Sequence, residues 1–178
     1  MKNIIKSKND ETLVKEYIER GKGLFNDGEY KKAFKDFNKA ILLNSEYSQT
    51  YLVKAQAHIA LFEVDEAEIC MNNYLKLNPY DPKGYFKLID IHDLTGDFDK
   101  CVYYCDKLLA IDDENLNIHL KKAEYLTLLY DYEGALKCFD TCLNLCPDFY
   151  EALCGKAKIL LSLQNKKVMS DINVVIQH

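Results

Sequence analysis

The chain has 178 residues, 48% of them hydrophobic, with seven glycines and three prolines, a composition that allows a buried core and argues against disorder. Its formal net charge is −5 at pH 7 and Arg20 is its only arginine, which excludes the basic, arginine-rich surface of a nucleic-acid-binding protein. The longest apolar runs are a few residues and the first six residues lack a signal-peptide core, so we expect a cytoplasmic protein without a membrane partner.

The first predicted elements are two helices joined by a tight turn. Between Asp10 and Asn26 one stripe of residues recurs at helical spacing and predicts a first helix, helix A: Leu13, Tyr17, Gly21 and Leu24. Asp27–Gly28–Glu29 breaks this pattern, because glycine accepts the positive φ that a tight reversal requires. A second helix, helix B, follows with the inward face Ala33, Phe37, Ala40 and Ile41. Small residues facing each other let the two backbones approach closely.

The same pattern recurs every 34 residues along the rest of the chain. An aromatic-type position holds Tyr17, Tyr51, Tyr85, His119 and Leu153. Small positions hold Gly21, Ala55, Ile89, Ala123 and Ala157, then Ala33, Ala67, Cys101 and Ala135, and a leucine-type row holds Leu43, Leu77, Ile111 and Leu145. Thr95–Gly96–Asp97 predicts another turn, and Asn78–Pro79 and Cys146–Pro147 predict the ends of two helices B. An uninterrupted period of this length indicates a solenoid of stacked helical hairpins.

At these positions the chain resembles the tetratricopeptide repeat (TPR) family, over about nine-tenths of its length. The best match is the first repeat, whereas the third departs most from the family pattern, with Ile89, Cys101 and Cys105 in place of Gly, Ala and Phe. The resemblance implies an all-α fold, a right-handed α-solenoid of stacked helix-turn-helix hairpins. The frame places a lead-in at 1–13, repeats at 14–47, 48–81, 82–115 and 116–149, and a degenerate or partial fifth repeat at 150–178.

The end of the chain departs from this pattern after Gly155. Met169 replaces the small residue and Asn173 the aromatic one, although a stripe at helical spacing still predicts a short helix B in the fifth repeat: Val168, Ile172 and Val175. The run 174–176 would leave apolar surface exposed, whereas the end of a solenoid normally has a polar face. The protein could self-associate there, belong to a longer stack, or have a frayed end.

Cysteine and histidine side chains are the candidates for metal chemistry. Cys101 and Cys105, and then Cys138, Cys142 and Cys146, lie one turn apart, a spacing that could offer thiolates to zinc. They also occupy core positions of the repeat, and the absence of a CxxC pair favours free thiols that act as small buried hydrophobes.

His58 and His92 occupy one position in consecutive repeats and could form a metal-binding or pH-sensing pair. Two histidines do not complete a metal site, and half-buried histidines bonded to the backbone are favoured. We therefore expect no metal and no cofactor. The sequence also lacks a catalytic triad arrangement, a phosphate loop and an HExxH motif, so we expect no enzymatic activity.

The resemblance implies a binding surface on the concave side, where helices A form the inner wall. By position this groove consists of Lys15, Ile18, Lys22, Gln49, Leu52, Gln56, Lys83, Phe86, Lys87, Asp90, Asn117, Leu120, Lys121 and Glu124, continued in the fifth repeat by Glu151, Cys154 and Lys158. Amides and charges of both signs alternate there with apolar side chains, a surface that can hold an extended or helical peptide.

One family subtype clamps the acidic tails of heat-shock chaperones with lysines and asparagines. The matching positions here hold Ile18, Lys22, Val53, Lys83 and Lys87, and only the two last lysines fit. A carboxylate would lack most of its donors, so this subtype is rejected.

The sequence thus predicts a non-catalytic scaffold for protein–protein interaction, with a peptide or protein ligand of unknown identity. One alternative is an assembly adaptor that self-associates through its apolar last repeat as a homo-oligomer. Another is an enzyme-associated regulator that binds a metal through the histidines or cysteines.

Overall fold

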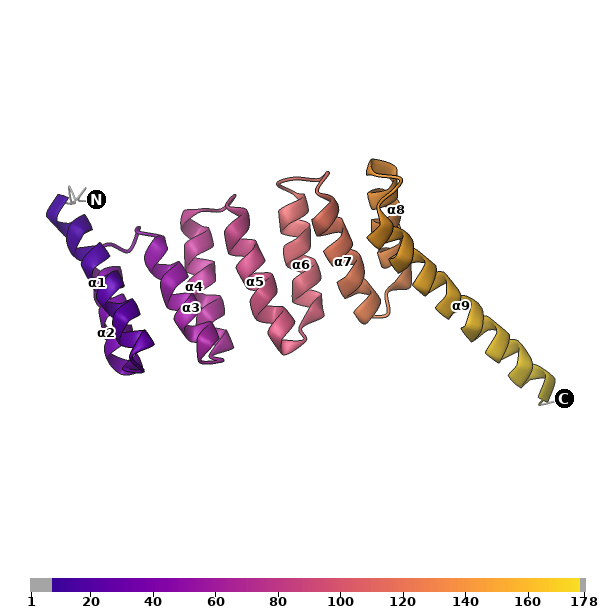
Figure 1. Cartoon of the computed structure of the whole chain (residues 1–178), viewed down its shortest axis with the longest axis horizontal. Helices are drawn as coiled ribbons and strands as arrows, with labels where there is room; N and C mark the ends of the chain where they lie inside the picture. Colours follow the sequence, from indigo (N-terminus) through magenta and orange to yellow (C-terminus); the bar gives the residue numbers. More distant parts are fainter. Residues whose placement is uncertain (1–7, 177–178) are drawn as a thin grey trace. The chain divides into compact units, whose positions relative to one another are not determined.

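The structure is a computed structural model that describes the fold of residues 8–176 and the side-chain environments of residues 10–165. The residues from 8 to 176 form nine α-helices and contain no strand, as the repeat pattern predicts (Figure 1). The helices are α1 (Lys8–Asn26), α2 (Tyr30–Leu43), α3 (Gln49–Ala60), α4 (Val64–Leu77), α5 (Pro82–Thr95), α6 (Phe98–Leu109), α7 (Leu116–Leu128), α8 (Tyr132–Leu145) and α9 (Tyr150–Ile176). Helices α4 and α8 end directly before the Asn–Pro and Cys–Pro pairs, as predicted.

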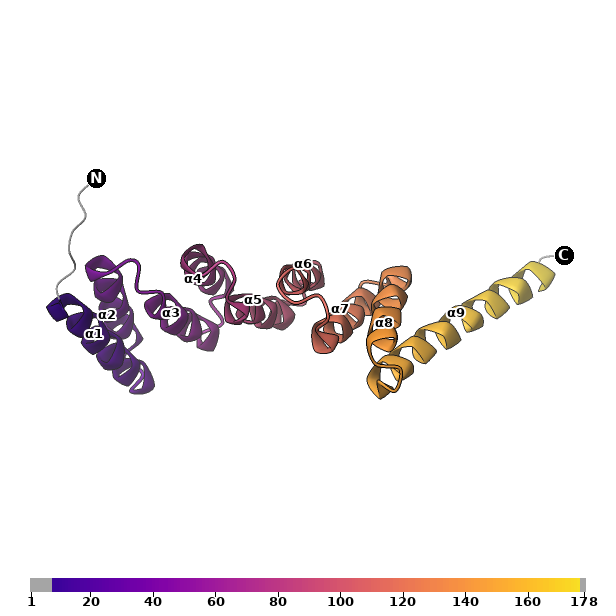
Figure 2. The ribbon, with the colours of Figure 1, turned by 90° about the horizontal axis from the view of Figure 1, so that it is seen from above.

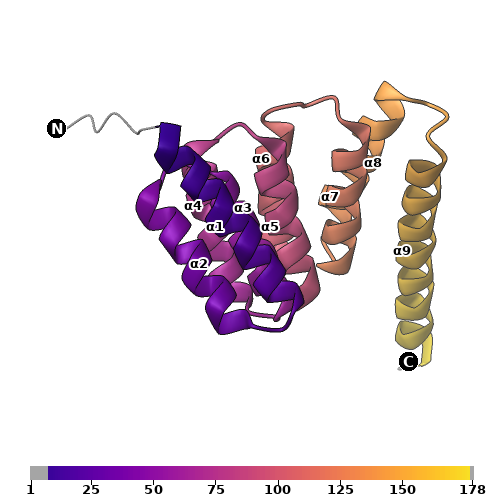
Figure 3. The ribbon, with the colours of Figure 1, turned by 60° about the vertical axis from the view of Figure 1, so that its left-hand side comes forward.

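The chain divides into two compact units, an N-terminal unit Met1–Ile91 and a C-terminal unit His92–His178. In the N-terminal unit α1 packs on α2 and α3 packs on α4, while α3 also contacts α1 and α2 (Figures 2 and 3). In the C-terminal unit α7 packs on α6, α8 and α9, and α8 packs on α9. Helices α3 and α7 therefore each contact the helix before them as well as the second helix of their own hairpin.

The turn between the two helices of each hairpin uses one left-handed residue at a fixed position. Gly28 and Gly96 have φ of 79° and 73°, which confirms the two predicted glycine turns. The equivalent position in the second and fourth repeats is Phe62, with φ 58°, and Tyr130, with φ 61°. The repeat thus imposes the same backbone turn even where an aromatic side chain makes it unfavourable.

Close helix approach in the hairpins depends on the predicted small residues. Ala33 and Ala123 are completely buried, and a methyl group added at Gly21 would lie 2.5 Å from the Phe37 ring. The buried stripe of α1 differs from the prediction, because Val14 is fully buried whereas Leu13 is 38% exposed. The reason is that α1 packs against both α2 and α3, so its buried arc is rotated toward α3.

Adjacent hairpins are also joined by a recurring polar pair. A lysine of helix A reaches an acceptor sixteen residues earlier, on helix B of the preceding repeat. The pairs are Lys54 with Asn38 at 2.9 Å, Lys122 with Asp106 at 2.6 Å, and Lys156 with Asp140. At the α4–α5 junction the lysine position holds Leu88, which is buried. The lysine bond therefore recurs at three junctions, and at the fourth a buried leucine takes the place of the lysine.

The predicted helix B of the fifth repeat is absent, because α9 continues as one helix from Tyr150 to Ile176. Ala157, predicted to occupy a tight small position, is exposed, since no second helix packs against it. The buried positions of α9 are instead Ala152 and Ile159, which face α7 and α8. The side chains of the predicted stripe at 168–175 lie outside the residues whose environments are described.

Candidate functional site

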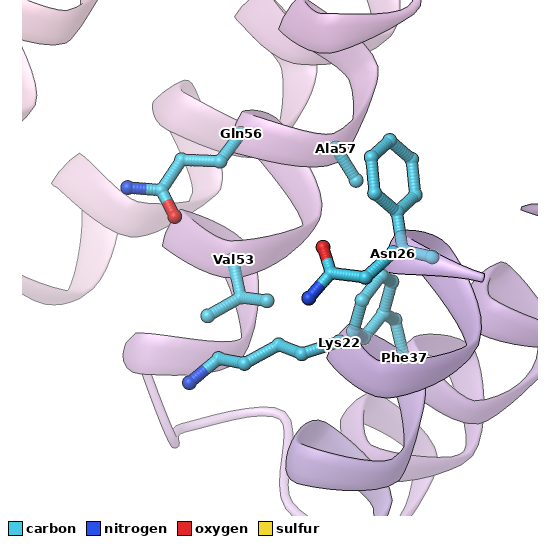
Figure 4. A pocket seen from close by; sticks show the side chains of 7 residues that line it. Lys22, Asn26, Phe37, Val53, Gln56 and Ala57 are labelled. Atoms are coloured by element: carbon cyan, nitrogen blue, oxygen red, sulfur yellow. The ribbon is translucent and has the colours of Figure 1, made fainter. Parts of the chain in front are cut away.

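The N-terminal unit contains a hollow between α1 and α3, with a volume of about 270 Å³. Its lining residues are Lys22, Phe25, Asn26, Phe37, Val53, Gln56 and Ala57 (Figure 4). Phe37 and Val53 are buried and form its floor, and the amides of Asn26 and Gln56 are at its exposed edge. The Lys22 amine is 2.7 Å from Glu19, so its charge is already compensated. This hollow offers an apolar floor and two amides, which suits the main chain of a peptide.

The C-terminal unit contains a larger hollow between α7, α8 and α9, with a volume of about 980 Å³. Its lining residues are Asp93, Leu120, Lys121, Glu124, Tyr125, Thr127, Leu128, Tyr132, Phe139, Tyr150, Glu151, Cys154, Gly155, Lys158, Ile159 and Ser162. Ile159 and Phe139 are buried in the core of this unit, and Leu120 packs against that core. The hollow therefore has an apolar floor, and its outer part carries the charged side chains.

Tyr125 lies at the inner side of this hollow and is 4% exposed. Burial, together with the charges of nearby acidic groups and thiols, raises the pKa of its hydroxyl, so Tyr125 stays neutral. The Lys121 amine lies 3.4 Å from that hydroxyl and 5.4 Å from the centre of the Tyr125 ring. Lys121 is thus positioned by an aromatic neighbour in the wall of the hollow.

Many of the groove residues predicted from the sequence lie at these two hollows. Leu120, Lys121 and Glu124 of α7 line the larger one together with the three fifth-repeat residues Glu151, Cys154 and Lys158. Lys22 and Gln56 line the smaller one. Lys15, Gln49, Leu52 and Asn117 are exposed or half-buried on their helices but line neither hollow. Lys15 forms an ion pair with Glu11 at 3.0 Å.

Ile18 is a correction to the predicted groove. It is 3% exposed and belongs to the core cluster that contains Val14, Phe37 and Val53. Because α1 is rotated toward α3, the Ile18 side chain packs between hairpins and is not accessible to a ligand.

The α5 group of the predicted groove remains accessible. Phe86 is 40% exposed, and Lys83 and Asp90 are exposed near it on the same helix. The Lys87 amine is 2.8 Å from the Asp90 carboxylate, so two members of the predicted site are paired with each other. A ligand carboxylate would therefore compete with Asp90 for Lys87, whereas Lys83 has no ion pair among the described residues.

Sequence reasoning missed the aromatic part of the larger hollow, which comes from Tyr125, Tyr132 and Tyr150. Tyr132 and Leu128 flank the α7–α8 turn, and Tyr150 begins α9. The groove was predicted from selected helix-A positions alone, and such a rule omits Tyr125 within α7 and the residues at the helix ends. A signal was present, because Leu128, Tyr132 and Tyr150 are large apolar or aromatic residues next to turns.

The two histidines are buried against aromatic rings, His58 against α2 of the preceding hairpin and His92 against α6 of its own hairpin. His58 Nδ1 lies 2.7 Å from Glu63 Oε2, and its ring stacks on Phe34 at 4.4 Å. His92 is 2% exposed and stacks on Tyr104 at 5.6 Å. Within residues 10–165 no group of three or more potential metal ligands is found. These contacts give both histidines a structural role.

The cysteines are free thiols, and Cys101, Cys105, Cys138 and Cys142 are buried as predicted, whereas Cys146, which lies at the end of its helix, is only half-buried. Burial raises the pKa of Cys101 to about 11 and that of Cys105 to about 12, with nearby negative charge adding to the effect. Burial likewise raises the pKa of Cys142 to about 11. Thiols of this kind stay protonated near neutral pH, whereas metal binding requires the thiolate.

No helix in the described part of the chain combines the length and the apolar character needed to cross a bilayer.

Comparison with known proteins places these features in a family. Residues 48–81 match the family model described as tetratricopeptide repeat. The chain is 23% identical over 139 residues to anaphase-promoting complex subunit 3 of Schizosaccharomyces pombe, covering 78% of this chain and 21% of that protein. It is 28% identical over 141 residues to Protein DIA2 of Saccharomyces cerevisiae, covering 77% of this chain and 18% of that protein. The chain thus spans about a fifth of the length of these relatives.

Solved structures with the same fold include MamA proteins and a TPR domain of RPAP3. The MamA AMB-1 structure has a TM-score of 0.63 at 17% identity and covers 86% of this chain and 84% of its own. The first TPR domain of Spaghetti (RPAP3), bound to an HSP90 peptide, has a TM-score of 0.54 at 20% identity and covers 68% and 96%. At these identities the likeness concerns the fold alone. With the family model, the 34-residue frame and the repeated hairpins in agreement, the chain is a tetratricopeptide repeat protein with an all-α solenoid fold.

Proposed function

We propose that this chain is a non-catalytic scaffold that binds a peptide or protein segment against its helix-A surfaces, with the larger hollow of the C-terminal unit as the main contact. The observation that carries the proposal is the convergence of predicted groove residues from α7 and α9 on one hollow of about 980 Å³. Tetratricopeptide repeats are typical of protein-interaction scaffolds, and the RPAP3 domain with this fold is bound to a peptide.

The lining of this hollow suits a segment with an apolar anchor residue. Leu120, Phe139 and Ile159 supply an apolar floor that an aliphatic or aromatic side chain would cover. Leu128 is 53% exposed and Tyr150 is 72% exposed, so both also offer apolar surface to a ligand. Burial of these surfaces supplies affinity, because apolar area removed from water stabilises the complex.

The charged side chains of the hollow orient the bound segment. Lys121 and Lys158 can bond carboxylates of the segment, whereas Glu124 and Glu151 can bond its lysines or arginines. Since both signs are present, we propose a ligand of mixed charge with its apolar anchor between acidic and basic residues. On α5, Lys83 and Phe86 offer a second cation and ring, for a carboxylate and an apolar side chain of a ligand.

An acidic chaperone tail is not the proposed ligand. At the positions that correspond to the clamp, Ile18 is 3% exposed and Val53 is 5% exposed, so both are core residues that donate no side-chain hydrogen bond. The peptide in the RPAP3 structure therefore concerns that protein only.

We also propose a cytoplasmic location. All seven cysteines are free thiols, which fits a reducing compartment.

The experiment selects ligands for the purified chain from a random peptide library and measures their affinity by calorimetry. Leu120→Glu with Lys158→Glu should weaken binding by more than about tenfold, because the anchor loses its apolar floor and the segment loses a cation. Lys107→Glu on α6 is the matched control, since this exposed lysine of the same unit lies outside the hollow. Circular dichroism should show equal helix content in all proteins.

A second variant, Phe86→Ala with Lys87→Glu, tests the α5 group. Unchanged affinity of both folded double variants, for every selected peptide, would reject binding on the helix-A surfaces. A loss in the α5 variant alone would move the main contact to the N-terminal unit.

A further inference from the structure

In the first four repeats, helix A is followed by a helix B. The first half of α9 occupies the helix-A position of the fifth repeat, but no separate helix B follows it. In the fourth repeat, Ala123 is completely buried and Leu126 is 8% exposed, because α8 covers this face of α7. The equivalent residues of the fifth repeat, 34 positions later, are Ala157, which is exposed, and Leu160, which is 48% exposed. Leu161 beside them is 60% exposed. The face that should receive a helix B is therefore present but uncovered.

The segment that the repeat frame assigns to this face is residues 166–176. The four left-handed turn residues lie at 34-residue intervals, and the next position in the series is Gln164. The residue after each turn precedes helix B, and here it is Asn165, a favourable residue for the start of a helix. In α9 both positions are helical, so residues 166–176 continue straight instead of folding back (Figure 1).

A straight α9 prevents this segment from covering its own face. A helix rises 1.5 Å per residue, so residues 166–176 extend about 16 Å beyond the turn position along the helix axis. The segment contains Met169, Ile172 and Ile176 at helical spacing, as a helix B would. When the hinge between two packed elements straightens, both of their packing surfaces remain available. Two copies of the chain can then exchange the identical element, which is a domain swap.

We propose that two copies of this chain associate by exchanging residues 166–176. The segment of each copy packs as the missing helix B against Ala157, Leu160 and Leu161 of the other copy. The exchange is reciprocal, so it closes as a two-fold dimer and covers both apolar faces. This association does not depend on peptide binding in the hollow of the C-terminal unit.

The test traps the contact between two positions that face each other in a hairpin. In the fourth repeat the facing small positions are Ala123 and Ala135, and their equivalents in the fifth are 157 and 169. The full chain carrying Ala157→Cys and Met169→Cys is prepared unlabelled and with ¹⁵N, mixed, and oxidised. Peptide mass spectrometry then identifies the 157–169 disulfide separately from links to native cysteines. Mixed-label 157–169 peptides are expected, together with a dimer mass by light scattering.

A hinge variant provides the second measurement. Gln164→Gly with Lys166→Pro favours the turn and breaks the straight helix, because proline is tolerated at the first position of a helix but not in its interior. It should raise the dimer dissociation constant by more than about tenfold and convert the trapped disulfide to a link within one chain. Gln164→Ala with Lys166→Ala, which favours the straight helix, should retain the dimer.

Three results would overturn the proposal: an unsubstituted chain that stays monomeric at all concentrations, a 157–169 link confined to single chains, or a dimer in which this link does not form.

Discussion

At the scale of single residues, the hairpins depend on side chains whose size is fixed by a neighbouring helix. Ala33, Ala123 and Ala135 are completely buried, and Gly21 and Gly155 leave no room for a methyl group beside Phe37 and Phe139. The same series places Ala157 on an exposed surface, because the helix that would pack against it is missing. The size of the residue at these positions is therefore limited by how closely the helices approach each other, in addition to the need for an apolar side chain.

Ala123→Leu should lower the free energy of unfolding by about 1–3 kcal/mol, because an interior already packed on all sides cannot take a larger side chain without strain. Ala123→Ser should be tolerated better, since serine adds one atom only. Thermal and urea unfolding monitored by circular dichroism measure both. An Ala123→Leu variant that melts no lower than the parent would show that this position is not the tight contact.

The buried cysteines should behave as inert core residues. Cys101→Ala and Cys142→Ala should each lower the free energy of unfolding by about 1 kcal/mol, the cost of a small cavity, without changing zinc content from background. At pH 8 a thiol reagent should label the half-exposed Cys146 and Cys154 first, because the pKa values of Cys101 and Cys142 are raised to about 11. Stoichiometric zinc that is lost on either substitution would contradict a purely structural role.

At the scale of elements, each hairpin is defined by its turn and by polar bonds between helices. The turn position takes a left-handed conformation whether it holds glycine or an aromatic residue. Between α1 and α2, Asp36 accepts two hydrogen bonds from Arg20, from Nε at 2.6 Å and from Nη2 at 2.8 Å. Asp36 is 4% exposed although it is charged, and this bidentate bond compensates its burial.

Phe62→Gly should raise the free energy of unfolding by about 0.5 kcal/mol. Glycine removes a left-handed backbone cost of about 1–2 kcal/mol and adds a smaller entropic cost in the unfolded chain. Phe62 is 80% exposed, so its ring contributes little packing. Phe62→Ala is the control, because it removes the ring but keeps the strained backbone and should give no gain. Equal melting temperatures of the two variants would show that the turn is not strained.

The Arg20–Asp36 bond should make stability depend on acid pH. The hydrogen bond from Arg20 holds the pKa of the Asp36 carboxyl below its ordinary value. Its stabilisation is therefore complete above the unfolded-state pKa of about 3.9 and is lost as pH falls through the lower folded-state pKa. Asp36→Asn should lower the melting temperature at pH 7, and its difference from the parent should shrink below about pH 4. A difference that is constant from pH 7 to pH 2.5 would contradict this assignment.

At the scale of the whole molecule, the chain consists of two compact units, each with its own helices and its own hollow. Helix α5 contributes residues to both units, since the division falls after Ile91. The lysine-to-acceptor pairs recur within each unit, at Lys54 in the first and at Lys122 and Lys156 in the second. One repeated interaction thus joins hairpins in both parts of the chain.

The sequence by itself determined the repeat, the all-α fold, the glycine turns and the burial of Phe37, Ala123 and Cys101. These features depend on local spacing, which the 34-residue period displays directly. The 34-residue period also contained the lysine–acceptor pairs, in which the two residues are sixteen positions apart. The pattern of a single helix does not reveal them, because the two residues lie on different helices.

Only the tertiary structure decided which helix faces are buried and where the hollows lie. Ile18 is in the core because α1 is rotated toward α3, and the larger hollow combines Tyr125 and Phe139 from inside α7 and α8 with Tyr132 and Tyr150 from the starts of α8 and α9. The straight α9 was not predictable from periodicity, because the apolar spacing of residues 150–176 fits one long helix and a hairpin equally well. Helical spacing fixes which residues share a face, but the neighbours that cover that face are fixed by packing across the chain.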